Sequence, residues 1–415
     1  MTDTPADRSP SAFARLFATA GLVQAADQIA LAALPVTAIL VLGAGPGLVG
    51  ALVAAQTAAW LLVSLPAGVV VDRLSKRRVL LAALALSLIA ATGAVAAAAL
   101  QKPVLLGIAA FLAAAGTVTF VLVQIGLMPE IVATANLPRA NARIELARAL
   151  ASAAAPFIVG YLATRISPLA GYCLAALLVL GALACATTLR PQVPSAAPAA
   201  RPPLFAAIAE GARFVLADPL LRAIGLCAVF WNFAFVALIA IFVPFALTRL
   251  GTDAAGAGLA QGVNGLGMIA GAAAAPFIFA RVQPRAVLLF GPLSSALGAI
   301  LMALSPHIGG LAVAALAFGL IGFGPMLWLV MQTSVRQIVT PPALMGRVTA
   351  TIQVAIYGIR PIGALAGGLV GQYAGLDAAI AMVAVAFAAS ALVSVASPLA
   401  RLATMPHPAP AAGRV

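Results

Sequence analysis

Two charged residues lie deep inside long apolar runs of the sequence. Asp27 stands in Gln24-Ala25-Ala26-Asp27-Gln28, about half-way along the run 14–42, and Arg360 stands before Pro361 in the run 348–374. A charged side chain at the centre of a bilayer costs ~2.5–3.5 kcal/mol on insertion scales. We therefore expect both side chains to face a polar cavity or a partner rather than lipid.

The sequence leaves two roles open for the Asp27 carboxyl. It could take up and release a proton, or contact a substrate, because it is expected to face a polar cavity. It could equally be a structural anchor, as a fixed ion pair or as a hydrogen-bond partner between helices.

Three partners are open for Arg360. It could pair with Asp27, since the two residues are expected at comparable depth and a paired buried charge is the cheaper state. It could also bind an anionic substrate, or it could have a structural role on backbone carbonyl groups.

An enzyme is not expected. Catalysis needs an acid, a base and a nucleophile at one place, and no apolar run of the sequence supplies such a group. No His, Cys and carboxylate cluster has metal-ligand spacing either, so neither a metal nor a cofactor is predicted.

The composition indicates an all-α membrane protein. Hydrophobic residues make up 64% of the 415 residues, charged residues only 8%, and the mean hydropathy is +1.13. A soluble domain carries about 25% charged residues. With so few charges most of the surface must face lipid, where the backbone has to be satisfied within helices.

Twelve apolar runs approach or exceed the ~20 residues that a transmembrane helix needs. The separators at Arg165–Pro168 and at Gly375–Asp377 are short. A single span over residues 144–189 would be 46 residues long and is physically excluded, so the chain must form a hairpin at each separator. The predicted runs are 14–42, 47–71, 79–101, 103–128, 144–167, 168–189, 220–248, 254–280, 286–304, 308–332, 348–374 and 375–400.

The distribution of basic residues predicts the orientation. With the N-terminus inside, 19 Lys and Arg residues fall in cytoplasmic segments and only Lys102, Arg165 and Arg249 fall outside. This bias favours a multi-pass protein of the bacterial inner (plasma) membrane with both termini cytoplasmic. The net charge of +13 is thus attributed to topology and contact with membrane lipids, and nucleic acid is not an expected partner.

The chain divides into two pseudo-symmetric halves of six helices. A segment rich in Pro and Ala, which includes a short amphipathic helix at Leu204–Leu216, separates them. Weak repeats relate the halves, and such parallel repeats are a known plan of transporters. The predicted parts are a cytoplasmic tail 1–13, a bundle 14–189, a cytoplasmic linker 190–219, a bundle 220–400 and a cytoplasmic tail 401–415.

A family resemblance begins in the loop between the second and third runs. Gly68-x-x-x-Asp72-Arg73-x-Ser75-Lys76-Arg77-Arg78 resembles the first-loop motif of the major facilitator superfamily. Other segments resemble its drug and siderophore exporter branch, although the exporter signature Gly-Pro-x-x-Gly-Gly is only partly retained. These are Leu127–Glu130 with Asn136–Asn141, Glu210–Phe214, Gly346–Val348 and the partial signature at Ala155–Tyr161.

The resemblance implies a gate at this loop. Asp72 is expected to contact the N-terminus of the run that contains Arg360, because a helix N-terminus attracts carboxylates. Arg73 or Arg77 is expected to pair with Glu130, and Gly68 to let its helix pack closely. Arg77 could instead be a simple topology signal.

The resemblance also implies which helices line the pathway, namely the runs 14–42, 103–128, 220–248 and 308–332. The cavity candidates are then polar or aromatic residues of these runs, although most intramembrane amides merely bond neighbouring helices. They are Gln24, Gln28, Gln124, Asn232 and Trp328.

Together these features favour a secondary active transporter that exports a small amphipathic compound (drug, siderophore or metabolite) by alternating access, coupled to proton entry. The expected partners are the small-molecule substrate, protons and membrane lipids, and by resemblance the protein is a monomer. A symporter or uniporter that imports a small polar metabolite is the first alternative. A non-transporting membrane sensor is the second.

Overall fold

Twelve helices of the computed structural model are long and apolar enough to span a membrane, counted over residues 10–132, 136–188 and 204–406, which are the residues the structure describes. This confirms the predicted all-α fold and the two predicted hairpins. One hairpin separates the helices that end at Arg165 and begin at Ala170, and the other separates those that end at Tyr373 and begin at Leu376.

Contacts divide the chain into two compact units. The first contains most of the first six helices, and the second contains the remaining helices together with Gly45–Ala54. The helices of the first part of the chain are α1 (Pro10–Leu40), α2 (Pro46–Arg73), α3 (Lys76–Ala99), α4 (Pro103–Ile131), α5 (Leu137–Arg165) and α6 (Ala170–Thr187). Those of the second are α7 (Leu204–Ala217), α8 (Pro219–Arg249), α9 (Ala254–Phe279), α10 (Pro284–Ile308), α11 (Gly310–Val339), α12 (Met345–Tyr373) and α13 (Leu376–Ala396), with short 3-10 turns at Pro342–Leu344 and Pro398–Arg401.

Local sequence explains where several helices begin and end. Asp218 caps α8 by accepting hydrogen bonds from the backbone N–H groups of Leu220 and Leu221, both at 2.9 Å, and Pro219 follows at the position where proline is best tolerated. At the C-terminal end of α6, Arg15 and Arg77 donate hydrogen bonds to the last carbonyl groups of the helix. Cations at a helix C-terminus complement its dipole.

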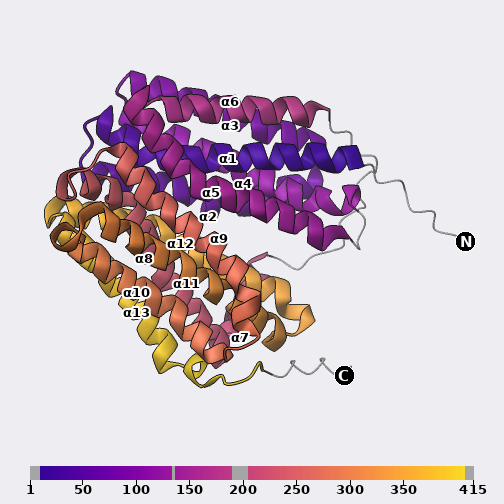
Figure 1. Cartoon of the computed structure of the whole chain (residues 1–415). Coiled ribbons are helices and arrows are strands. Elements are labelled where there is room, and N and C mark those ends of the chain that lie inside the picture. The colour runs from indigo at the N-terminus through magenta and orange to yellow at the C-terminus, as the bar shows by residue number, and fades with distance from the viewer. Residues whose placement is uncertain (1–9, 133–135, 189–203, 407–415) are drawn as a thin grey trace, which may run out of the picture. The chain divides into compact units, whose positions relative to one another are not determined.

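In the first unit, α1 packs on α4, α5 and α6, and α3 packs on α4 and α6 (Figure 1). A core of Leu, Val, Ala and Phe side chains that includes Phe120 fills this bundle. Small residues let α3 and α4 approach closely, since a Cβ atom on Gly116 would lie 2.8 Å from the Ala83 carbonyl oxygen. This is the packing expected in lipid, where small residues bring helix backbones together.

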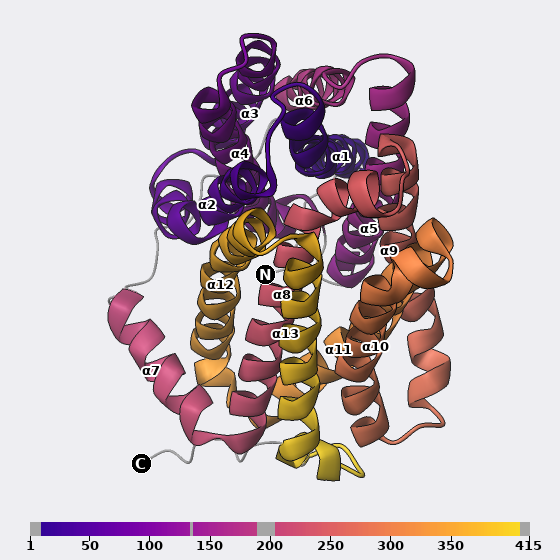
Figure 2. The ribbon, with the colours of Figure 1, turned by 90° about the vertical axis from the view of Figure 1, so that its left-hand side faces the viewer.

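In the second unit, α8 packs on α12 and α13, while α11 packs on α9 and α10 (Figure 2). Glycines again mark the closest crossings: Gly363 of α12 faces the Phe233 carbonyl of α8, and Gly322 of α11 faces the Asn264 carbonyl of α9. The predicted amphipathic helix is present as α7. Its Glu210 pairs with Arg347 at the start of α12 at 2.5 Å.

Two helices extend well beyond the predicted runs: α5 begins at Leu137 rather than at residue 144, and α11 continues past residue 332. The predicted run ended at residue 332, before the polar residues Thr333 and Ser334, but α11 continues to Val339. Polar side chains do not end a helix, whereas Pro341 and Pro342 do, because the residue before a proline is driven out of the helical region. Arg336, predicted to lie in a cytoplasmic segment, is therefore part of a helix that is long and apolar enough to span a membrane.

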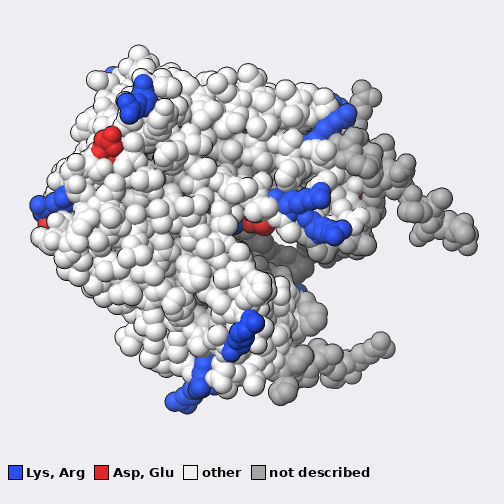
Figure 3. Space-filling view, in the orientation of Figure 1, with Lys and Arg blue, Asp and Glu red and all other residues white. Residues whose placement is uncertain are grey.

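Charged side chains are rare on the visible surface, as the composition requires. Large parts of the face in Figure 3 carry neither blue nor red side chains. The two intramembrane charges Asp27 and Arg360 are partly buried in their own units.

Candidate functional site

Asp27 lies on α1 among polar side chains of the first unit. Its carboxylate accepts a hydrogen bond of 3.2 Å from Gln28 Nε2, and the hydroxyl of Thr117 on α4 also contacts it. The positive charge of Arg148 on α5 acts on it through space. Asp27 is only partly buried, whereas Ala26 and Ile29 beside it are buried. The contacts of the carboxyl are therefore with neutral polar groups.

Arg148 itself forms a local ion pair. Its guanidinium binds Glu145 of the same helix at 2.8 Å. No ion pair joins Asp27 to another residue of the first unit, as far as the described part of the chain extends. A fixed ion pair within the unit is thus not what holds Asp27.

The amide candidates of the first unit are buried to different degrees. Gln24 on α1 and Gln124 on α4 are each 7% exposed, and Gln28 is partly exposed. The Oε1 atoms of Gln124 and of Gln56 on α2 are buried without a hydrogen-bond partner among the described residues. Such atoms favour a polar ligand, because an unsatisfied buried polar group costs about 1–3 kcal/mol.

Two contacts of Arg360 lie within the second unit. Its Nε atom donates a hydrogen bond of 2.9 Å to Asn232 Oδ1 on α8, and its guanidinium lies 5.5 Å from the ring centroid of Tyr357. Asn232 is in turn oriented by a bond of 2.9 Å from its Nδ2 atom to the Ala228 carbonyl. The Asn232 amide thus presents its oxygen to the Arg360 guanidinium. The predicted pairing of Arg360 with Asp27 stays a prediction.

Trp328 lies on α11, packed against the start of α10. Trp328 is 9% exposed. A Cβ atom added to Gly291 would lie 2.4 Å from the Cβ atom of Trp328. Its indole Nε1 atom is buried and has no hydrogen-bond partner among the described residues.

The ion pair at the loop motif differs from the predicted one. Glu130 binds Lys76, with Nζ to Oε1 at 2.5 Å, rather than Arg73 or Arg77. Lys76 is the first residue of α3 and also donates to the Gly126 carbonyl of α4 at 2.9 Å. Arg77 is one position further round the helix and points to the end of α6, where it binds the Thr187 carbonyl. Arg73 is exposed.

The expectations for the other two residues of the motif stay predictions. An added Cβ atom on Gly68 would meet no atom of the described residues within 4 Å, so the glycine has no close neighbour within its own unit. The side chain of Asp72 lies outside the described residues. Its contact with the start of α12 stays a prediction.

Several neighbours of the site were missed in the sequence. Thr117 and Tyr357 gave no signal, because a hydroxyl or a phenol is common in apolar helices. Arg336 could have been found from the spacing Trp328-Gln332-Arg336-Thr340, which repeats every four residues as one face of a helix does.

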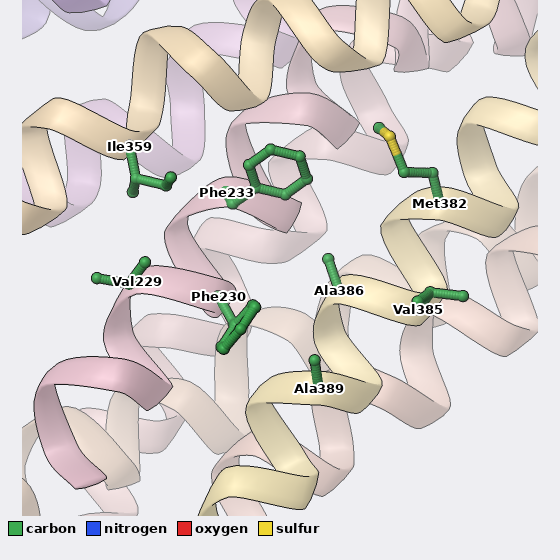
Figure 4. Close-up of a pocket in the computed structure, with 8 residues that line it drawn as sticks. All are labelled: Val229, Phe230, Phe233, Ile359, Met382, Val385, Ala386 and Ala389. Atoms are coloured by element: carbon green, nitrogen blue, oxygen red, sulfur yellow. The ribbon is translucent and has the colours of Figure 1, made fainter. Parts of the chain in front are cut away.

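An apolar pocket of about 370 Å³ lies between α8, α12 and α13 (Figure 4). Every side chain that lines it is apolar. The lining residues are Val229, Phe230, Phe233, Ile359, Met382, Val385, Ala386 and Ala389. It offers no group for proton or ion chemistry, so the candidate site is the polar one around Asp27 in one unit and around Arg360 in the other.

Comparison with solved structures shows the same fold in several transporters. The nucleoside transporter NupG matches with a TM-score of 0.74 at 15% identity, covering 93% of this chain and 98% of that chain. A POT family transporter in complex with a thioalcohol-conjugated peptide matches with a TM-score of 0.74 at 14% identity, covering 92% and 95%. A bacterial homologue of the human lysosomal transporter Spinster matches with a TM-score of 0.70 at 16% identity, covering 95% and 97%.

The sequence comparison gives the family. No curated protein matches the chain, but the family profile described as Major Facilitator Superfamily matches residues 16–364. That match spans most of the chain and includes the loop motif and both intramembrane charges. The chain therefore belongs to the Major Facilitator Superfamily and is a multi-pass membrane transporter of that type.

Proposed function

We propose that this transporter exports a small amphipathic compound from the cytoplasm in exchange for protons. In this account Asp27 carries the proton. Substrate and proton use the carboxyl in alternation as the protein changes between its two access states, and protonation of Asp27 shifts the balance between those states.

The observation that carries the proposal is the setting of Asp27. Asp27 is a partly buried residue of a helix that is long and apolar enough to span a membrane. The side chains that contact its carboxyl are an amide and a hydroxyl rather than a bound cation. A carboxylate locked to Arg or Lys would be costly to protonate, because breaking a buried pair leaves an uncompensated charge. Asp27 has no such lock within its unit, over the residues that the structure describes.

Export is favoured by the loop motifs. The segments Leu127–Glu130, Asn136–Asn141 and Glu210–Phe214 resemble the drug and siderophore exporter branch of the family. Glu130 and Glu210 are both used in ion pairs, with Lys76 and with Arg347. These pairs are consistent with a structural role of the two glutamates at the helix ends.

The test uses inverted membrane vesicles that contain the full chain, a panel of fluorescent amphipathic dyes and an imposed gradient with the acidic side inside. We expect the wild type to accumulate at least one dye. Asp27→Asn should keep the fold and exchange dye at equal concentrations, but should lose accumulation driven by the gradient, because an amide cannot carry the proton.

The matched control is Asp377→Asn, which removes an exposed carboxylate that pairs with Arg249 at a helix end. It should accumulate dye as the wild type does. Full gradient-driven accumulation by the Asp27→Asn variant would overturn the proposal.

Import of a small polar metabolite is the second candidate. The pair of Arg360 and Asn232 favours it, since the pair offers polar contacts to a polar or acidic solute. The similar folds include a nucleoside transporter and peptide transporters. Uptake of a nucleoside or a dipeptide into right-side-out vesicles, with no dye export, would favour this candidate.

A further inference from the structure

Four buried polar atoms without a hydrogen-bond partner lie on one helix of the second unit. They are Trp328 Nε1, Gln332 Oε1, Arg336 Nε and Thr340 Oγ1. Among the described residues of that unit, no other side-chain N or O atom is buried without a partner. All four belong to α11 or to the residue that caps its end.

The spacing puts the four side chains in one row. Each is four residues after the previous one, and residues four apart lie above one another on a helix. The row covers about 18 Å along the axis, because each residue rises by about 1.5 Å. It begins near mid-span at Trp328 and ends at Thr340, the end of α11 that the sequence predicts to be cytoplasmic.

The surroundings of the row are apolar. Leu327, Met331 and Val335 alternate with it along α11 and belong to a core cluster with residues of α8 and α10. Gln332 is 5% exposed and Thr340 2% exposed, whereas Arg336 is a partly exposed residue of which the Nε atom is buried. In such surroundings an unpaired donor or acceptor loses its bonds to water without compensation, so buried polar groups nearly always have a partner.

The charge of Arg336 also lacks a counterpart. The described part of the second unit has four acidic residues, and each has another partner. Asp218 and Asp253 cap helices, Glu210 pairs with Arg347, and Asp377 pairs with Arg249. No hydrogen bond or ion pair from the described residues reaches the Arg336 side chain.

We propose that the Gln332–Arg336–Thr340 face of α11 is a binding site for an acidic group that carries a neighbouring hydroxyl, such as a phosphate ester or a phosphate monoanion. The guanidinium of Arg336 holds the anionic oxygen, and the Thr340 hydroxyl donates a second hydrogen bond to it. The Gln332 Oε1 atom accepts from the hydroxyl of the ligand.

The chemistry of the row distinguishes this ligand from a simple halide. Two donors with a positive charge fit an oxyanion, since charge-assisted bonds to Arg are among the strongest in proteins. The remaining acceptor requires a ligand that also donates. The ligand can be the headgroup of an anionic lipid or a free acidic solute, and the site is independent of proton coupling at Asp27.

The first arm of the test measures thermal unfolding of the purified full chain in a neutral detergent, with sodium phosphate against sodium chloride at equal ionic strength. Phosphate should raise the unfolding midpoint of the wild type by mass action. Arg336→Gln should weaken phosphate binding roughly tenfold or more, because it removes a charge-assisted hydrogen bond. Arg281→Gln is the matched control, since it removes an exposed arginine that binds only its own helix, and it should respond as the wild type does.

The second arm measures which lipids stay bound, by native mass spectrometry after incubation with phosphatidylglycerol or phosphatidylcholine. Selective retention of phosphatidylglycerol that Arg336→Gln abolishes identifies a lipid headgroup, whereas a phosphate response alone identifies a free solute. Either result supports the site.

A second pair of variants keeps the test decisive if Arg336→Gln does not fold. Thr340→Val is nearly isosteric and Arg336→Lys keeps the charge, so both should fold and bind several-fold more weakly. Unchanged phosphate response and unchanged lipid retention in the folded variants would overturn the proposal and leave water as the partner of the four atoms.

Discussion

The bond between Arg360 and Asn232 joins α12 to α8 within the membrane. Its donor is charged and its acceptor is buried, with an N to O distance of 2.9 Å. Hydrogen bonds to charged groups contribute about 1.5–3 kcal/mol in soluble proteins, but measured values between membrane helices average about 0.6 kcal/mol. The contribution to stability is therefore expected between these limits.

A double-mutant cycle measures this contribution. Asn232→Leu should lower the free energy of unfolding because it removes the hydrogen bond from Arg360 Nε to Asn232 Oδ1, and Arg360→Met should lower it as well. The double variant should be more stable than the sum of the two losses by about 0.6–3 kcal/mol. Thermal or denaturant unfolding in detergent gives the four values, and strict additivity would show that the two side chains are not coupled.

The sequence singles out individual charged residues more readily than it predicts which residues contact them. Asp27 and Arg360 stand out because a charge within an apolar run is expensive wherever it points. Their neighbours are not readable from the chain, since Thr117 and Asn232 come from distant helices that only the packing brings close. The assignment of Glu130 to Arg73 or Arg77 failed for this reason, because the side-chain direction at the start of α3 selects Lys76.

At the scale of the elements, helices are held together by close backbone contact. Gly322 of α11 lies against α9, where an added Cβ atom would be 2.1 Å from the Asn264 carbonyl oxygen. The Asn264 side chain adds a bond of 3.2 Å from Nδ2 to the Phe318 carbonyl. Without a hydrophobic effect between helices in lipid, such contact and such bonds determine the packing.

A single methyl group tests this crossing. Gly322→Ala should destabilise the protein by about 1–3 kcal/mol, because the backbone of α9 must move to accommodate the methyl group. Gly93→Ala is the matched control, since Gly93 is also inside a spanning helix but has open space around it. The control should be neutral or slightly stabilising. An equal response of the two variants in thermal unfolding would contradict the account of the crossing.

Element ends were predictable only where the chain carries a backbone signal. Pro103, Pro219 and Pro284 begin helices close to the predicted places, because proline is tolerated in the first turn. Hydropathy alone ended α11 too early. The row of Trp328, Gln332, Arg336 and Thr340 was therefore not recognised, because its last two residues lie beyond the predicted end of the helix.

At the scale of the whole molecule, the composition determines the fold class. So few charges are compatible only with lipid as the main surroundings. Twelve apolar runs are separated by loops, and along the chain every second loop is rich in Lys and Arg. The twelve helices are confirmed, whereas the orientation rests on the basic loops. The proposed direction of transport depends on this orientation, and so does the prediction that the end of α11 at Thr340 faces the cytoplasm.

Site-directed labelling tests this orientation most directly. Single cysteines are introduced by Ser75→Cys, between α2 and α3, and by Lys102→Cys, between α3 and α4, after replacement of Cys173, Cys185 and Cys227. Both positions are exposed, and neither side chain caps its helix. In intact cells a membrane-impermeant maleimide should label the Lys102→Cys variant and should label the Ser75→Cys variant only after the membrane is opened. Labelling of Ser75→Cys in intact cells, with Lys102→Cys protected, would contradict the account.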